Sequence, residues 1–218
     1  MLRLLHKLHY KIGKYYISNL MLYIVIAQAA VFAFDYLFID RGMSLQMWLY
    51  FDRGLILSGQ VWRIITFIIV PFESNPIFMF IMMILYVNIG RTLENAWGGF
   101  YFNAFYFIGV IGSIIGGFIT GFATIDYINT SIFLAFALLY PHMQFLLFFI
   151  IPVKAKWLAI IYLAFIGIEF VLSPLPGKVA ILISFVNIVI FFWDDYFPKI
   201  RDKFRYRKIR RSYRREMK

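Results

Sequence analysis

The chain of 218 residues is too apolar for a soluble domain, because 62% of its residues are hydrophobic and only 15% are charged. Soluble domains have about 25% charged residues, and a soluble core cannot bury this much apolar surface, whereas a bilayer can. The lack of cysteine excludes disulfides, cysteine nucleophiles and thiolate metal sites. The net charge of +11 is concentrated in residues 199–218, which hold eleven Lys and Arg.

Residues 1–18 precede the first apolar run and have an amphipathic pattern. Apolar residues recur at helical spacing from Leu4 to Tyr15, and lysines occupy other positions. This pattern predicts a helix that lies in the headgroup region on the cytoplasmic side. A signal peptide is the alternative, since residues 27–29 resemble a cleavage site, but the apolar run continues well past them.

Six apolar runs predict an all-α integral membrane domain over residues 19–198. All but the fourth are near the ~20 residues that a bilayer core requires. The fourth is short and ends at Pro141, where a helix stops or kinks, and we expect it to line a cavity or to be shielded by protein. The expected spans are 19–38, 74–91, 99–122, 128–140, 157–173 and 178–197.

The distribution of Lys and Arg predicts the orientation of this bundle. Six spans place the N-terminal segment, the loops 91–98 and 141–156 and the tail on one side, which then holds 18 of the 22 Lys and Arg. The positive-inside rule therefore puts both termini in the cytoplasm. We expect the basic cytoplasmic tail, residues 199–218, to bind anionic lipids and no specific nucleic acid, because the tail is tethered at the membrane.

The external loop 39–73 is long and itself apolar, and it includes Trp62 and Arg63. We expect an amphipathic loop that dips into the outer leaflet. Arg63 would then reach lipid phosphate or pair inside the fold, and a simple interface anchor is the alternative. Trp62 and Arg63 are therefore candidate residues for lipid or client binding.

Two further motifs predict structural roles. Glu94 lies at the cytoplasmic end of the second span, where we expect it to accept hydrogen bonds from loop amides or to pair with Arg91. The third span is rich in glycine, and Gly112 and Gly116 are four residues apart. This spacing allows close helix approach, which we expect within the monomer, with a dimer interface as the alternative.

The fourth and sixth spans carry the polar residues of interest. Asn129 and Ser131 lie near the external start of span four. In span six, Ser184 and Asn187 are three residues apart and share a helical face, which we expect to point toward span four. Glu169, near the external end of span five, is expected to be interfacial rather than catalytic.

The sequence offers no clear base for Ser131, which would need one within roughly 3 Å to act as a nucleophile. His142 is eleven residues away, about 16 Å along a helix, and His6 and His9 are cytoplasmic. A Ser131–Lys178 dyad is the remaining option, although an interface charge is the preferred role of Lys178. The three histidines lack ligand spacing, so no metal site and no cofactor are expected.

Taken in order, these landmarks resemble the rhomboid superfamily of six-span membrane proteins over residues 19–198. The matching pieces are the Trp62–Arg63 pair, the stretch 90–98, the glycine-rich third span, the short fourth span and the stretch 149–158. Residues 60–67 and 194–198 are similar to the derlin branch, whose members are non-catalytic.

The chain departs from the pattern of rhomboid proteases at the catalytic positions. Those enzymes carry Gly-x-Ser-Gly on span four and a histidine on span six. Here residues 129–132 read Asn-Thr-Ser-Ile, and span six has no histidine. We therefore expect a bacterial rhomboid-like pseudoprotease of the plasma membrane.

The resemblance implies that the protein binds transmembrane segments of client proteins, in membrane-protein quality control or trafficking. The expected client-binding or lipid-binding residues are Trp62, Arg63, Asn129, Ser184 and Asn187. The alternative is an active intramembrane serine protease that uses Ser131 with Lys178. A transporter or channel would require inverted repeats or charges along a path, and the sequence shows no convincing repeat.

Overall fold

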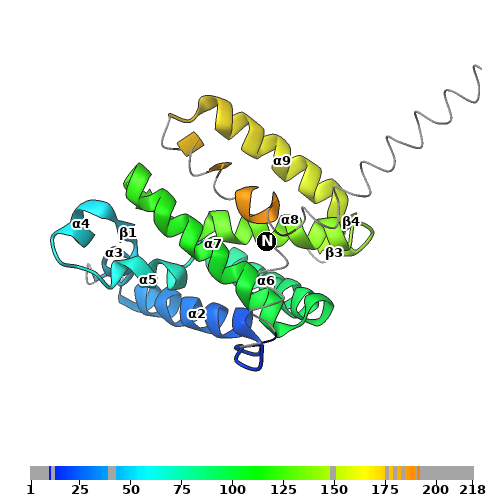
Figure 1. Cartoon of the computed structure of the whole chain (residues 1–218), viewed down its shortest axis with the longest axis horizontal. Coiled ribbons are helices and arrows are strands. Elements are labelled where there is room, and N and C mark those ends of the chain that lie inside the picture. Colours follow the sequence, from blue (N-terminus) through cyan, green and yellow to red (C-terminus); the bar gives the residue numbers. More distant parts are fainter. Residues whose placement is uncertain are drawn as a thin grey trace, which may run out of the picture.

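The computed structural model describes residue 10 and residues 13–38, 43–147, 151–174, 177–178, 181–182, 185–189 and 191 (Figure 1). Over this part the chain is mostly helical, and four helices are long and apolar enough to cross a membrane. The chain is thus an α-helical integral membrane protein. The four helices are α2 (Leu20–Phe38), α6 (Pro76–Trp97), α7 (Gly99–Thr120) and α9 (Ala155–Leu172).

These helices correspond to the first, second, third and fifth predicted spans. The boundaries agree within a few residues, except that α6 continues to Trp97, where Gly98 ends it with φ 87°. The fourth predicted span corresponds to the helix α8 (Asp126–Leu139), which is shorter, as predicted. Of the sixth span only 178, 181–182, 185–189 and 191 are described, each helical, so the six-span bundle stays a prediction. Residues 1–9 and the basic tail lie outside the described residues.

The loop after α2 is folded onto the bundle. The Asp35 carboxylate, in the last turn of α2, accepts hydrogen bonds from Ser44 Oγ at 3.1 Å and from the amides of Leu45 and Gln46 at 2.5 and 3.3 Å. The loop buries Phe51 and exposes Trp48, so it is amphipathic as predicted. Its elements are α3 (Gln46–Leu49), β1 (Phe51–Asp52), α4 (Arg53–Leu57), α5 (Arg63–Thr66) and the 3-10 helix η2 (Phe67–Ile69).

Two short strand pairs accompany the helices of this all-α fold. Strand β1 pairs antiparallel with β2 (Phe122–Ala123), between α7 and α8. A hairpin of β3 (Gln144–Leu147) and β4 (Ile151–Lys154) forms within the predicted loop 141–156. Such pairing satisfies backbone hydrogen-bonding groups outside the helices, and helical periodicity carries no signal for it.

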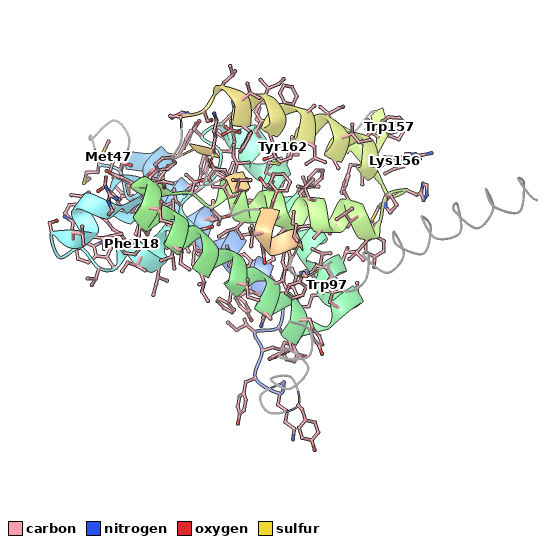
Figure 2. All side chains as sticks on the ribbon, turned by 45° about the horizontal axis from the view of Figure 1, so that its top comes forward. Met47, Trp97, Phe118, Lys156, Trp157 and Tyr162 are labelled. Carbon is pink, nitrogen blue, oxygen red and sulfur yellow. The ribbon has the colours of Figure 1, made fainter. Side chains whose placement is uncertain are left out.

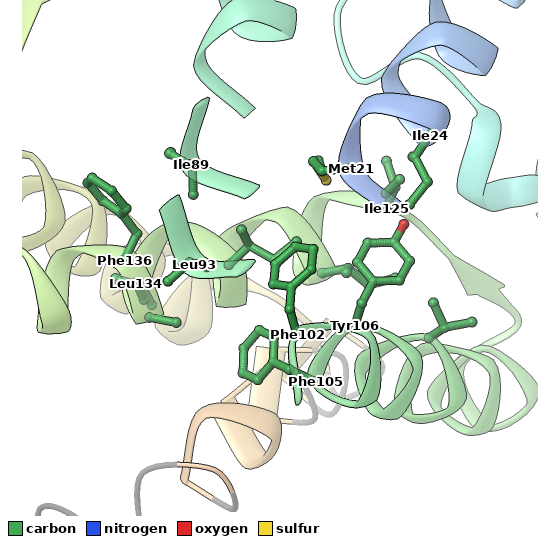
Figure 3. Packing of buried hydrophobic residues seen from close by; sticks show 14 of the residues in the cluster. Met21, Ile24, Ile89, Leu93, Phe102, Phe105, Tyr106, Ile125, Leu134 and Phe136 are labelled. Atoms are coloured by element: carbon green, nitrogen blue, oxygen red, sulfur yellow. The ribbon is translucent and has the colours of Figure 1, made fainter. Parts of the chain in front are cut away.

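Helix α8 lies inside the bundle, in contact with α6, α7 and α9 (Figure 1). Its residues are buried almost continuously from Ile128 to Ala137. Figure 3 shows the apolar core beside it, with Met21 of α2, Leu93 of α6, and Phe102 and Tyr106 of α7. The prediction that the short fourth span is shielded by protein is therefore confirmed. In contrast, α9 is mostly exposed, and only 17% of its membrane-length apolar stretch is buried inside the protein.

Glycine allows close packing of α7, and Gly117 makes one such contact. Gly116 is buried and Gly112 is half-buried. A Cβ on Gly117 would lie 2.6 and 2.8 Å from ring carbons of Phe51 and 2.9 Å from Ala123 Cβ. This contact of α7 is with the β1–β2 pair of the same chain, which agrees with glycine packing within the monomer.

We predict that Gly117→Ala lowers the midpoint of thermal unfolding in detergent. Overpacking costs about 1–3 kcal/mol, which exceeds the ~1 kcal/mol that alanine gains over glycine in a helix. Gly167→Ala on α9 is the matched control, because a Cβ there meets no atom within 4 Å. Equal stability of the two variants would contradict the close packing of Phe51 on α7.

Candidate functional site

Three consecutive polar residues lie in the first turns of α8. Asn129, Thr130 and Ser131 are only 3%, 4% and 1% exposed. An apolar bundle accepts polar side chains at such positions because neighbouring helices keep them from lipid. This stretch of α8 is therefore the centre of the candidate site.

The Ser131 hydroxyl is held by hydrogen bonds that do not activate it. Its Oγ donates to the Ile128 carbonyl at 2.7 Å, and Asn187 Nδ2 donates to the same Oγ at 3.4 Å. Asn187 Nδ2 also donates to the Phe105 carbonyl at 3.2 Å. The prediction that Asn187 faces span four is thus confirmed. A carboxamide does not take up a proton near neutral pH, so Asn187 cannot serve as the base.

The other candidate bases lie elsewhere. Lys178 Nζ lies 6.0 Å from the centre of the Phe170 ring. Among the described residues, the hydrogen-bond partners of Ser131 Oγ are Ile128 and Asn187, and Lys178 is not one of them. His142 is exposed in the turn before the β hairpin, beyond the C-terminal end of α8. Ser184 lies outside the described residues.

Some buried polar atoms have no hydrogen-bond partner within the described part of the chain. They include both amide atoms of Asn129, the Oδ1 of Asn187 and the hydroxyl of Tyr106. An unsatisfied buried polar group costs about 1–3 kcal/mol. Packing stability therefore does not explain why these positions are polar.

A cavity of about 240 Å³ lies between α8 and α9. Its polar lining is unusual for so apolar a chain, and two isoleucines complete it. Figure 2 shows Tyr162 on α9, farther along the helix than Lys156 and Trp157. The polar residues that line the cavity are Thr124, Asp126, Tyr127, Thr130, Tyr162 and Glu169.

Hydrogen bonds join the two walls of this cavity. The hydroxyls of Thr130 and Tyr162 lie 2.8 Å apart, and Thr130 Oγ1 also donates to the Asp126 carbonyl at 2.7 Å. Asp126 precedes the predicted span 128–140. It lines the cavity together with Glu169.

The sequence indicated Ser131 and Asn129 on α8, but it did not indicate the residues of α9 that line the cavity. Tyr162, Ile166 and Glu169 recur at intervals of four and three residues, which puts them on one helical face. That pattern is the signal that could have indicated the cavity. It was hidden because most other residues of α9 are apolar.

The structure gives Arg63 a role inside the loop. Its side chain is 3% exposed. Its Nε donates to Gln60 Oε1 at 2.7 Å, one terminal nitrogen donates to the Tyr50 carbonyl at 2.9 Å, and the guanidinium lies 4.9 Å from the Tyr50 ring centre. Arg63 was expected either to reach lipid phosphate or to pair inside the fold, and in the structure it pairs inside the fold. Trp62 remains 44% exposed, and its indole N–H donates to the Trp48 carbonyl at 3.1 Å.

Glu94 joins the end of α6 to the start of α2. Its two carboxylate oxygens accept hydrogen bonds from the Asn19 amide at 3.0 and 3.1 Å. This is one of the two arrangements predicted for Glu94. Arg91 is exposed on α6.

We predict that Arg63→Lys destabilises the protein by about 2 kcal/mol, because a lysine cannot reproduce the planar fork that reaches Gln60 and Tyr50. The free energy of unfolding in detergent would measure this loss. Arg91→Lys, at an exposed position, is the control and should change stability little. A neutral Arg63→Lys variant would contradict the structural role.

Comparison with protein-family models, with curated proteins and with solved structures finds no match. The resemblance to the rhomboid superfamily therefore remains a prediction from the motifs, and a function for this chain rests on the geometry described above.

Proposed function

We propose that this chain is a non-catalytic rhomboid-like membrane protein that binds transmembrane segments of client proteins, in membrane-protein quality control or trafficking. The observation that carries the proposal is the bonding of Ser131. Its hydroxyl donates a hydrogen bond to the Ile128 carbonyl. The described side chain that donates to its oxygen is the amide of Asn187. The most buried hydroxyl on α8 is therefore arranged for packing rather than for nucleophilic attack.

The cavity between α8 and α9 supports binding as the function. It is polar on both walls, and it borders a helix whose surface is mostly exposed. A transmembrane segment that approaches α9 from the lipid could place a side chain in this cavity while its apolar surface stays against Ile166 and neighbouring residues. Without a water-driven hydrophobic effect, such association depends on close packing and interhelical hydrogen bonds, and the cavity supplies groups for both.

The alternative protease function is tested by labelling with a fluorophosphonate, which reacts with activated serine. We predict that wild-type protein and Ser131→Ala incorporate the probe equally, because no described base contacts the hydroxyl. Mass spectrometry of the labelled protein would locate any adduct. Labelling at Ser131 that disappears in Ser131→Ala, and also in Lys178→Met, would establish the dyad and overturn the non-catalytic proposal.

We predict that a photoreactive residue at position 166, on the cavity wall, crosslinks transmembrane segments of other proteins in native membranes. The same residue at position 115 is the control, because Ile115 is an exposed residue of α7 that does not line the cavity. Mass spectrometry of the adducts would identify the captured segments. Recovery of lipid alone at position 166, or equal protein capture at both positions, would contradict client binding at this cavity.

A further inference from the structure

We infer that the cavity between α8 and α9 receives a basic side chain, Lys or Arg, carried by the transmembrane segment of a client protein. This inference rests on the proposed function and adds to it the chemistry of the segment that is recognised. It is carried by the positions of two carboxylates, by the lack of a described cation beside them, and by the aromatic walls of the cavity.

The two carboxylates of the cavity lie at opposite ends of their helices, so the helix dipole affects their charges in opposite ways. Asp126 is in the first turn of α8, where the helix dipole stabilises a negative charge. Glu169 is in the last turn of α9, where the dipole destabilises one. Both side chains line the same cavity of about 240 Å³. A cation between them would relieve both the repulsion between the carboxylates and the unfavourable position of Glu169.

The described part of the chain does not supply this cation. Lys178 is the nearest basic residue in sequence to Glu169, and its Nζ lies 6.0 Å from the centre of the Phe170 ring. Among the described residues, Glu169 takes part in no ion pair. The basic tail, by the charge distribution, is predicted to lie on the opposite side of the membrane.

The remaining walls suit a long basic side chain. Tyr127 and Tyr162 line the cavity, and aromatic rings attract cations. The hydrogen bond between Tyr162 and Thr130 holds one of these side chains in place. Ile166 and Ile181 complete the lining, where the methylene stem of Lys or Arg can pack while its charged group reaches the carboxylates.

A client segment fits this cavity better than a lipid amine does. The zwitterionic headgroup of phosphatidylethanolamine brings a phosphate with its ammonium group, and two carboxylates would repel that phosphate. A basic residue in a client span brings no anion. Such a residue is also costly to expose to lipid, so a carboxylate-lined cavity beside an exposed helix stabilises it.

The test uses the full-length protein in phosphatidylcholine vesicles and two synthetic single-span peptides. The peptides are identical except for Lys or Leu at one position near the end that matches Asp126, and fluorescence energy transfer measures their binding. We expect the Lys peptide to bind about tenfold more tightly. Glu169→Gln and Asp126→Asn should each reduce this preference to about twofold or less, whereas the control Glu73→Gln, an acid outside the cavity, should preserve it.

The outcomes separate this inference from the function on which it rests. Equal binding of the two peptides would overturn the recognition of a basic side chain and leave client binding intact. Failure of both peptides to bind would overturn the recognition of a basic side chain and client binding alike. A Lys preference that survives in both cavity variants would overturn the site. Loss of the preference when phosphatidylethanolamine is added would assign the cavity to a lipid amine instead. Thermal unfolding of each variant confirms that it is folded.

Discussion

The exclusion of polar groups from lipid is the constraint on which this structure depends. Polar atoms at membrane depth need partners from the protein, because hydrocarbon offers none. Helix α8 carries Asn129, Thr130 and Ser131 in its first turns, and the surrounding helices α6, α7 and α9 cover it. Its short length is tolerated for the same reason, since a helix surrounded by protein does not have to match the bilayer thickness.

The same enclosure determines the chemistry of the site. Ser131 satisfies its hydroxyl with the Ile128 carbonyl and the Asn187 amide, and these partners stabilise the neutral alcohol. A catalytic serine needs an adjacent group that takes its proton. The described partners of this serine do not include such a group. The polar groups that remain open to a ligand lie on another face of α8, toward α9.

In the loop before α6, charged side chains are likewise satisfied by partners within the protein. Asp35 binds two of its amides, and Arg63 binds Gln60 and Tyr50 within it. With both charges engaged inside, the loop can expose apolar side chains such as Trp48. Charge in this region thus stabilises the loop, and the apolar residues form its surface.

Much of this protein follows from its sequence, because a bilayer imposes helix length and composition. Runs of about 20 apolar residues indicated α2, α6, α7 and α9, and Pro141 indicated the short α8. The missing histidine predicted that Ser131 lacks a base. The sequence did not determine the β hairpin, whose strands pair locally without a distinctive pattern, or the partner of Arg63. Only tertiary structure brought Glu169 of α9 to the same cavity as Asp126 of α8, since residues 43 positions apart become neighbours only when their helices pack.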